Sequence, residues 1–324
     1  MIDAAIVGLG RWGQGLVEAV QGKSAAIRFV RGATRTPAKA EAFCARLGIP
    51  LGDDYAAALR DRKVKAVVLA TPHTQHADQI VAAARRKKHV FCEKPFTLTR
   101  RTAERALAAC AKSGLVVGLG HNRRWMENTR ELKRMIDAGE LGTLLHVESN
   151  FSADLTPAAG QWRDSRAESP AGGMTSLGIH AVDMMINLCG PIAEVDARSQ
   201  RRALPYDVDD TTCALLGFRN GMSGYIGTMA VGGRAWNVRV FGSKAWAELR
   251  GADRLIVCGQ DGVENVRQFS GDSSLRGELE AFAAACEGGP AFPITPDQIV
   301  NGVATLEAII KSAERGGKVM KIAG

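Results

Sequence analysis

The run Ala4-Ala-Ile-Val-Gly8-Leu-Gly10-Arg-Trp-Gly13 takes the chain from a short apolar stretch directly into the pattern GxGxxG. The pattern alone is weak evidence, but here it follows a predicted strand and opens a predicted helix. In that context Gly8 allows a tight turn, Gly10 lets backbone approach a pyrophosphate, and Gly13 lets the helix pack close to the strand. The free N–H groups at the helix N-terminus favour phosphate. We therefore predict a dinucleotide-binding unit, with an ordinary glycine turn as the alternative.

The residues up to position 121 alternate β-branched runs with alanine-rich helical stretches, which predicts a doubly wound parallel sheet with helices on both faces, an α/β Rossmann domain. The predicted strands are Ala4–Gly8, Ile27–Ala33, Ala66–Ala70, His89–Cys92 and Leu115–Gly118. The predicted helices are Trp12–Gln21, Pro37–Leu47, Tyr55–Arg60, Thr74–Lys87 and Arg100–Ser113. Residues 1–121 are thus expected to form an NAD(P)-binding domain.

Residues 122–324 have a different pattern of predicted elements, in which many strand-like segments are separate in sequence from a few helices. The predicted strands are Leu144–Phe151, Ala193–Ser199, Thr211–Phe218, Met222–Thr228, Trp236–Phe241, Trp246–Leu249 and Arg254–Cys258, and the predicted helices are Trp125–Ala138, the end of Pro170–Leu188, Leu275–Cys286 and Asp297–Arg315. Strands segregated from helices predict an α+β domain with an open, mostly antiparallel sheet. We expect this domain to bind substrate and to support oligomerisation.

The length and composition agree with two globular domains, since 324 residues with 46% hydrophobic and 23% charged side chains exceed one ordinary core. No apolar run approaches the ~18 residues of a membrane span. The start MIDAAIVGLG lacks the basic region of a signal peptide. The seven cysteines are scattered and form no CxxC pair, which is typical of reduced thiols. We therefore expect a cytoplasmic protein without a structural metal.

The formal net charge of +8 raises the question of nucleic acid. The basic residues are spread along the chain, and the densest cluster, Arg85 to Lys88, ends a predicted helix, where cations are ordinarily favourable. No nucleic-acid recognition motif accompanies them. The charge is better interpreted as a general field that attracts a phosphorylated cofactor.

The end of the second predicted strand indicates which dinucleotide is preferred. An NAD-binding domain usually has Asp or Glu about 20 residues past the glycines, to bind the ribose 2′-hydroxyl. Here the segment reads Thr34-Arg35-Thr36. An arginine flanked by hydroxyls would bind a 2′-phosphate, which an acid would repel. We predict NADP(H) over NAD(H), with a solvent-facing or adenine-stacking Arg35 as the alternative.

Two further loops should border the cofactor, because ligands bind beyond the carboxyl ends of strands in such sheets. The first carries Thr71, Pro72, His73 and His76. The two histidines have a metal-like spacing but no nearby third ligand, so local capping is the favoured interpretation. The second is Glu93-Lys94-Pro95, where a lysine ends an apolar strand and is a candidate buried ammonium. An exposed Glu-Lys ion pair is the alternative.

Together with Gly178-Ile-His180-Ala-Val-Asp183, the glycine loop and Glu93-Lys94-Pro95 resemble the glucose–fructose oxidoreductase, inositol dehydrogenase and rhizopine-catabolism (Gfo/Idh/MocA) family. The resemblance runs along nearly the whole chain. It implies reversible hydride transfer between a nicotinamide and a carbinol or carbonyl carbon, usually of a sugar or cyclitol, in a cleft between the two domains. It also implies that Lys94 and His180 bracket the reacting oxygen.

Chemistry supports these implied roles. Oxidation of an alcohol requires a base for the hydroxyl proton, which a histidine can supply, and a lysine ammonium can stabilise the developing alkoxide. The family motif usually reads Asp-x-Gly-x-His, whereas this chain has Ser176 at the first position. Serine hydrogen-bonds but carries no negative charge. Asp183 follows one helical turn past His180 and is expected to orient the helix or the histidine.

The remaining site predictions are sets of residues. The predicted cofactor contacts are Gly8, Gly10, Arg11, Trp12, Gly13, Thr34, Arg35, Thr36, Thr71, Pro72, His73, His76, Glu93 and Lys94. The candidate substrate contacts are His121, Arg123, Arg124, Trp162, Arg163, Ser176 and Asp183, where arginines could bind hydroxyls or a carboxylate. Each of these could instead serve packing or a surface ion pair.

The sequence thus predicts an NADP(H)-dependent oxidoreductase of a sugar, polyol or cyclitol. A reductase or dehydrogenase of a small non-carbohydrate aldehyde or ketone is an alternative, since folds host many chemistries. A dinucleotide-binding sensor with little catalysis is another, kept open by Ser176. Strands such as Thr212–Phe218 have apolar side chains on both faces, so a homo-oligomer formed through the second sheet is expected.

Overall fold

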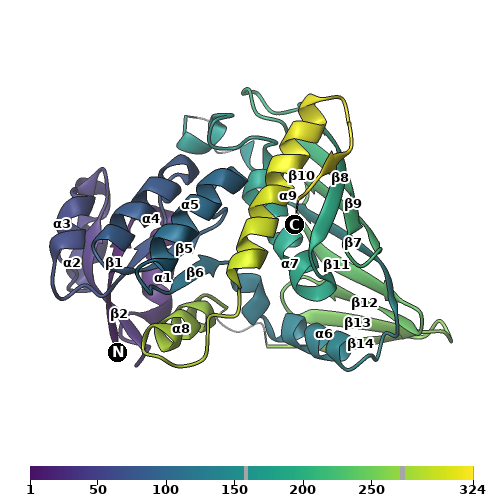
Figure 1. Cartoon of the computed structure of the whole chain (residues 1–324), viewed down its shortest axis with the longest axis horizontal. Coiled ribbons are helices and arrows are strands. Elements are labelled where there is room, and N and C mark those ends of the chain that lie inside the picture. Colours follow the sequence, from purple (N-terminus) through teal and green to yellow (C-terminus); the bar gives the residue numbers. More distant parts are fainter. Residues whose placement is uncertain (157–159, 271–273, 324) are drawn as a thin grey trace. The chain divides into compact units, whose positions relative to one another are not determined.

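The computed structural model describes residues 1–156, 160–270 and 274–323 and contains two compact units (Figure 1). Unit 1 comprises Met1–Thr97, Arg101–Asn122 and Ser273–Ile299, and unit 2 comprises Leu98–Arg100, Arg123–Asp272 and Val300–Gly324. Most of unit 1 precedes residue 123, and most of unit 2 follows it. The helix α8 (Ser274–Cys286) differs, because it belongs to unit 1 although we expected it in the second domain.

Unit 1 is built on a six-stranded parallel sheet with the order β3-β2-β1-β4-β5-β6. Its strands are β1 (Ile2–Val7), β2 (Ile27–Ala33), β3 (Leu51–Gly52), β4 (Ala66–Leu69), β5 (His89–Glu93) and β6 (Val117–Gly120). The order reverses between β1 and β4, which pair side by side from Ala4↔Ala66 to Val7↔Leu69. Such a reversal is where ligands bind in doubly wound sheets, and the glycine loop begins immediately after β1.

The helices of unit 1 are α1 (Arg11–Val20), α2 (Glu41–Arg46), α3 (Tyr55–Arg60), α4 (His76–Arg85), α5 (Arg100–Ala111) and α8. The single helix expected over Pro37–Leu47 is wrong. A 3₁₀ turn, η1 (Pro37–Lys39), is separated from α2 by the buried Ala40, whose backbone leaves helical geometry at φ −120° and ψ 0°. Thr36 makes no side-chain capping hydrogen bond there.

The helix α8 joins unit 1 because Phe282 packs against its sheet. The Phe282 ring lies 5.6 Å from that of Phe91 on β5, in an edge-on arrangement. It also covers Gly118 on β6, where an added Cβ would come within 2.9 Å of the Phe282 ring. The helix over Leu275–Cys286 was predicted, but the sequence did not indicate which of the two sheets that helix would cover.

Unit 2 contains a nine-stranded sheet with the order β14-β13-β12-β11-β7-β10-β9-β8-β15. The bounds are β7 (Leu144–Ser152), β8 (Ile192–Gln200), β9 (Thr211–Phe218), β10 (Ser223–Met229), β11 (Ala235–Gly242), β12 (Ala245–Arg250), β13 (Arg254–Gly259), β14 (Glu264–Gln268) and β15 (Met320–Lys321). Only β7 and β10 pair in parallel among the neighbours described. The mostly antiparallel sheet is therefore confirmed, whereas β14 and β15 were not predicted.

One face of this sheet carries the core of unit 2. The helices α6 (Glu127–Asp137), α7 (Ile179–Cys189) and the later part of α9 (Pro296–Glu314) contribute apolar side chains to a single buried cluster. Inward-pointing strand residues such as Val147, Leu216 and Val240 complete that cluster. Figure 1 shows α7 lying along the strands of this sheet. Among the described residues, the helices lie on one face of this sheet and none covers the opposite face.

That opposite face exposes large apolar side chains on three adjacent strands. Leu145 on β7 is 54% exposed, Leu215 on β9 is 59% exposed, and Tyr225 on β10 is 40% exposed. Leu215 and Tyr225 are direct cross-strand partners. Single exposed apolar residues are normal, but neighbouring ones on one sheet face are typical of an interaction surface.

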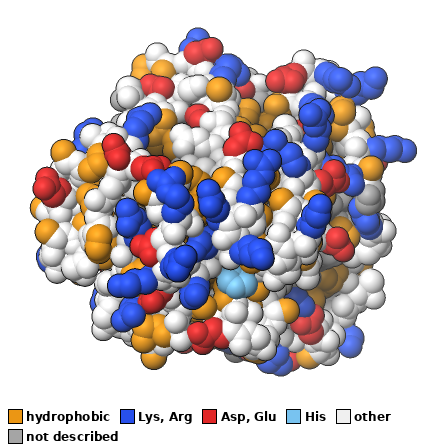
Figure 2. Space-filling model, turned by 60° about the vertical axis from the view of Figure 1, so that its left-hand side comes forward, with side chains coloured by type: hydrophobic (Ala, Val, Ile, Leu, Met, Phe, Trp, Pro, Cys, Tyr) orange, Lys and Arg blue, Asp and Glu red, His pale blue; other side chains and the backbone are white. Residues whose placement is uncertain are grey.

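The molecular surface in Figure 2 shows Lys and Arg side chains interspersed with Asp and Glu side chains over the face that it draws. Several of the basic residues are already engaged. Lys88, from the cluster noted in the sequence, is 9% exposed and donates to the carbonyl oxygens of Asp61 and Val64. Among the helices in the described part of the chain, none is sufficiently long and apolar to cross a membrane.

Candidate active site

The glycine loop fits a pyrophosphate. Gly8 has φ +90°, and a Cβ there would lie 2.5 Å from the carbonyl oxygen of Ala70. A Cβ on Gly13 would lie 1.9 Å from the carbonyl oxygen of Gly8, so α1 can approach β1 only with glycine there. A Cβ on Gly10 would meet nothing within 4 Å, so its backbone borders open space. Exposed backbone at the N-terminus of a helix offers N–H groups, which phosphate groups bind.

The loop after β2 presents an available arginine. Thr34 is anchored by its backbone N–H, which donates to Gly52 O at 3.0 Å. Arg35 is exposed and makes no hydrogen bond or ion pair with any residue the structure describes. Arg31, which lies on β2 itself, instead forms an ion pair with Asp61, with 3.5 Å between Nη1 and Oδ2. Of these two arginines, Arg35 is therefore the one whose donors are open to a ligand, with Thr36 exposed beside it.

His76 connects the loops that follow β4 and β5. This side chain is fully buried at the start of α4. Its Nε2 lies 3.0 Å from Thr71 O and its Nδ1 lies 3.0 Å from Pro95 O. The imidazole thus lies between the Thr71 loop and the Lys94 loop, donating to one of the two carbonyl oxygens as a neutral ring and to both as an imidazolium, a role that the expected local capping did not include. His73, 4% exposed, stands edge-on to His76 with ring centroids 6.0 Å apart.

The Lys94 loop is built around a buried carboxylate. Glu93 is 5% exposed, and its Oε2 accepts a hydrogen bond from the Lys94 backbone N–H at 3.2 Å. Gly120 makes room for it, because a Cβ there would lie 2.6 Å from Glu93 Oε1. The peptide bond between Lys94 and Pro95 is cis. Burial raises the pKa of the neighbouring Cys92 thiol, which leaves it an unreactive core group.

In unit 2, a π-helical turn leads into α7 and carries the second motif. The turn covers Met174–Gly178, and such turns are frequently found at functional sites. Gly178 is closely packed there, since a Cβ would lie 2.3 Å from Met174 Sδ and 2.7 Å from Thr228 Cγ2. The turn places Ser176 and His180 in the interior with exposed fractions of 8% and 6%. The His180 ring packs on Phe151 of β7 with centroids 5.8 Å apart.

Asp183 and Arg124 form a buried ion pair. Arg124 Nε donates to Asp183 Oδ2 at 2.9 Å and Nη2 donates to Oδ1 at 2.6 Å, a bidentate arrangement. The two side chains are only 7% and 5% exposed. Arg124 Nη1 also donates to Asn187 Oδ1 at 3.2 Å. Because their charges are directed at each other, this pair ties the turn at Asn122–Trp125 to α7.

The other candidate substrate residues are divided between the units. His121 is 4% exposed and belongs to unit 1. Arg123, in unit 2, packs against the rings of Phe151 and Trp236. Trp162 lies on a short 3₁₀ turn, and the Arg163 guanidinium stacks 4.1 Å from its ring. The structure therefore brings Arg123 and His180 to one aromatic pair in unit 2.

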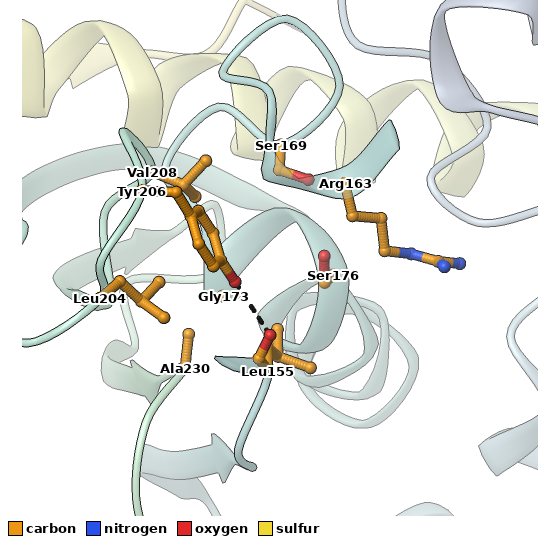
Figure 3. A pocket seen from close by; sticks show the side chains of 10 residues that line it. Leu155, Arg163, Ser169, Gly173, Ser176, Leu204, Tyr206, Val208 and Ala230 are labelled. Atoms are coloured by element: carbon orange, nitrogen blue, oxygen red, sulfur yellow. Dashed lines mark hydrogen bonds between the residues drawn. The ribbon is translucent and has the colours of Figure 1, made fainter. Parts of the chain in front are cut away.

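A small cavity adjoins Ser176 (Figure 3). Its volume is about 30 Å³, and it is lined by Leu155, Arg163, Ser169, Gly172, Gly173, Ser176, Leu204, Tyr206, Val208 and Ala230. Tyr206 Oη donates to Leu155 O at 2.9 Å across it. Ser169 Oγ is buried and finds no hydrogen-bond partner among the described residues. A volume of this size holds about two water molecules, so it is too small for a sugar ring.

Comparison with known proteins identifies the family. The family model described as "Oxidoreductase family, NAD-binding Rossmann fold" matches residues 2–121. The model of the GFO/IDH/MocA C-terminal domain matches residues 129–248. The chain belongs to the GFO/IDH/MocA oxidoreductase family. It is accordingly an NAD(P)-binding enzyme of the dehydrogenase and reductase type. The resemblance inferred from three short motifs is confirmed.

Several relatives match nearly the whole length of the chain. D-xylose 1-dehydrogenase (NADP(+)) 2 of Haloferax volcanii is 30% identical over 320 residues, covering 94% of this chain and 93% of that protein. A putative NADPH-dependent oxidoreductase from Desulfitobacterium hafniense superposes with TM-score 0.90 at 26% identity, covering 99% and 97%. Levoglucosan dehydrogenase, in complex with NADH and levoglucosan, superposes with TM-score 0.89 at 20% identity, covering 99% of both chains.

The aromatic pair in this oxidoreductase is the part of the site that sequence reasoning missed. Phe151 and Trp236 pair across β7 and β11, and their ring centroids are 4.8 Å apart. Neither residue lies in one of the recognised motifs. The sequence placed both residues in predicted strands, but a predicted strand does not indicate which other strand it pairs with.

Proposed function

We propose that this enzyme transfers a hydride between NADP(H) and a carbinol or carbonyl carbon of a sugar, polyol or cyclitol. The observation that carries the proposal is that both units match one oxidoreductase family while retaining a fitted glycine loop, Lys94 and His180. A relative of nearly equal length is named for D-xylose and NADP(+), which supports both the substrate class and the cofactor.

The cofactor would be held by the glycine loop, Arg35 and the loops that carry Thr71 and Glu93. The bound nicotinamide supplies the hydride acceptor or donor. We assign His180 as the base that takes the hydroxyl proton and returns it in the reverse direction. We assign Lys94 as the cation that stabilises the developing alkoxide. His76 is a positioning residue, because it holds the carbonyl oxygen of Pro95, next to Lys94.

A substrate panel tests this function. Pentoses, hexoses, polyols and cyclitols, with small aldehydes and ketones as a separate set, are incubated with NADP⁺ or NADPH while absorbance at the nicotinamide band is followed. We expect turnover on at least one carbohydrate or cyclitol that exceeds every simple aldehyde and ketone in kcat/KM. Tight NADPH binding without turnover on any compound would instead support a dinucleotide sensor and overturn the proposal.

Arg35 should determine the preference for NADP(H). Arg35→Asp is expected to raise the Kd for NADPH about 10–100-fold, because a charge-assisted hydrogen bond to phosphate is replaced by repulsion. The Kd for NADH should change much less. Isothermal titration of both cofactors measures this. Arg62→Asp is the matched control, since Arg62 is also an exposed arginine of unit 1. Wild-type preference for NADH, or equal effects of the two variants, would contradict the assignment.

The apolar outer face of the second sheet is proposed to form a homo-oligomer interface. Replacing Leu215 and Tyr225 together by glutamate places two charges on adjacent strands of that face. We expect the mass measured by light scattering to fall to that of a smaller species, because burying two unpaired carboxylates is strongly unfavourable. Val319→Glu, at a 50% exposed residue that precedes the edge strand β15, is the control. An unchanged mass in the double variant would exclude this surface.

A further inference from the structure

Arg123 occupies a corner formed by two aromatic rings. Its Cζ lies 4.4 Å from the ring centroid of Phe151 and 4.2 Å from that of Trp236. The two ring centroids are themselves 4.8 Å apart at an angle of 64°, so the rings meet at an edge and enclose the guanidinium from two sides. Contacts of this kind fix an arginine's position and leave its N–H groups free to bind something else.

The charge of Arg123 has no counterpart within the described protein. Its Nε is buried without a hydrogen-bond partner, and no described carboxylate lies within ion-pair distance of its guanidinium. The adjacent Arg124 is the contrast, because Asp183 binds it in a bidentate pair. A desolvated cation without an anion is costly, so natural proteins rarely keep one without a purpose.

The surroundings increase this excess of positive charge. Burial, together with the charge of Arg234, lowers the pKa of Arg123 to about 10, which leaves it cationic at neutral pH. Arg234 is exposed, and no described acid lies within ion-pair distance of it. Ser176 is buried on the turn before His180 and, unlike the aspartate usual in the family motif, brings no negative charge.

Arg123 is also next to the proposed catalytic histidine. Phe151 contacts both side chains, since its ring lies 5.8 Å from the His180 ring and 4.4 Å from Arg123 Cζ. A ligand that reaches His180 is therefore within the length of a small molecule of the guanidinium. Arg123 is partly exposed, so its remaining N–H groups are accessible to such a ligand.

We propose that Arg123 binds a carboxylate of the substrate, which makes the preferred substrate a sugar acid or a related hydroxy acid rather than a neutral sugar. This inference rests on the hydride-transfer function proposed above. The planar fork of a guanidinium matches a carboxylate with two parallel hydrogen bonds, and the aromatic corner pre-organises that fork. A phosphate ester offers similar oxygens, and the experiment separates the two.

The test compares matched substrates. Wild-type kcat/KM is measured for D-glucose, D-glucuronate and D-glucose 6-phosphate, and for D-galactose and D-galacturonate, in both reaction directions where the compounds allow. We expect a uronate to exceed its neutral partner at least tenfold. In Arg123→Met the ratio of acid to neutral kcat/KM should fall about 10–100-fold, mainly through KM, because the charge-assisted bonds are lost. Arg123→Lys should retain part of the ratio.

A binding measurement keeps the test independent of turnover. D-glucuronate or D-galacturonate should raise the unfolding temperature of the NADPH-bound wild type and should have little effect on NADPH-bound Arg123→Met. The unfolding temperature of Arg123→Met without ligand reports whether that variant folds. Arg198→Met, which removes an exposed arginine from β8 of the same unit, is the matched control and should keep the acid-to-neutral ratio of the wild type.

The outcomes distinguish the two proposals. If neutral sugars turn over as well as their acids and Arg123→Met leaves the ratio unchanged, the carboxylate assignment is overturned while the hydride-transfer function stands. A preference for the 6-phosphate over the uronate also overturns it. Absence of turnover on every compound, with NADPH still bound, removes the proposed function itself. If the acids shift the unfolding temperature only of proteins that contain Arg123, the assignment is supported.

Discussion

Lys94→Ala and His180→Ala are each expected to lower kcat/KM on the preferred substrate about 10²–10⁴-fold. The first removes the cation proposed to stabilise the alkoxide, and the second removes the proposed base. NADPH should still bind, because the glycine loop and Arg35 remain intact. Steady-state kinetics and titration of NADPH fluorescence measure the two quantities. The double variant should lose little more than the worse single variant, since residues acting as one unit are not additive.

The pH profile separates a base from a merely structural histidine. In the wild type, the rate of alcohol oxidation should rise with pH as the base loses its proton, whereas His180→Ala should lose that limb of the profile. His146→Ala and Lys65→Ala are the matched controls, because His146 is a partly exposed histidine on β7 and Lys65 is an exposed lysine of unit 1. Full turnover in both Lys94→Ala and His180→Ala would show that the roles are assigned to the wrong residues.

Asp183→Ala should destabilise unit 2 by about 3–5 kcal/mol, because it leaves the guanidinium of Arg124 buried without its carboxylate. The cost arises from an uncompensated charge more than from the lost attraction. Denaturant unfolding followed by tryptophan fluorescence measures it. Asp137→Ala is the control, since Asp137 is 60% exposed in its ion pair with Lys133 and should cost less than about 1 kcal/mol.

A second variant distinguishes stability from catalysis at this pair. Arg124→Met combined with Asp183→Leu removes both charges and should recover much of the stability lost in Asp183→Ala, because a buried pair is often replaceable by apolar side chains. If Asp183→Ala were as stable as Asp137→Ala yet inactive, Asp183 would act on the substrate instead. The bidentate geometry with Arg124 makes the structural role the expected one.

Local signals were sufficient for most of unit 1. The strand Ile27–Ala33 and the helix Tyr55–Arg60 coincide with β2 and α3 because alternation, apolar runs and caps act within a few residues. The glycine loop could also be predicted locally, since Gly8 and Gly13 avoid clashes with nearby backbone and Gly10 leaves its backbone open. The helix over Pro37–Leu47 failed because Ala40 adopts its conformation in a buried position, which pattern cannot show.

The candidate site depends on contacts between residues that are far apart in the sequence. Lys94 and His180 were named from motifs, but the tie from His76 to both Thr71 and Pro95 spans two loops that only the parallel pairing of β4 and β5 brings together. Arg124 and Asp183 are 59 residues apart and find each other only when α7 is packed. The neighbouring letters of Arg123 and Arg124 therefore do not indicate which of the two arginines has a carboxylate partner in the protein.

The sequence by itself determined the type of each unit, the class of cofactor and the family, because those depend on short-range periodicity and on backbone freedom at a few glycines. Tertiary structure alone decided which charges are neutralised. The register of β7 against β11 places Phe151 beside Trp236 and so forms the corner that holds Arg123, while Arg124, one residue later, turns to Asp183. Ionic partners are chosen by distance in space, and no local pattern in a chain encodes that distance.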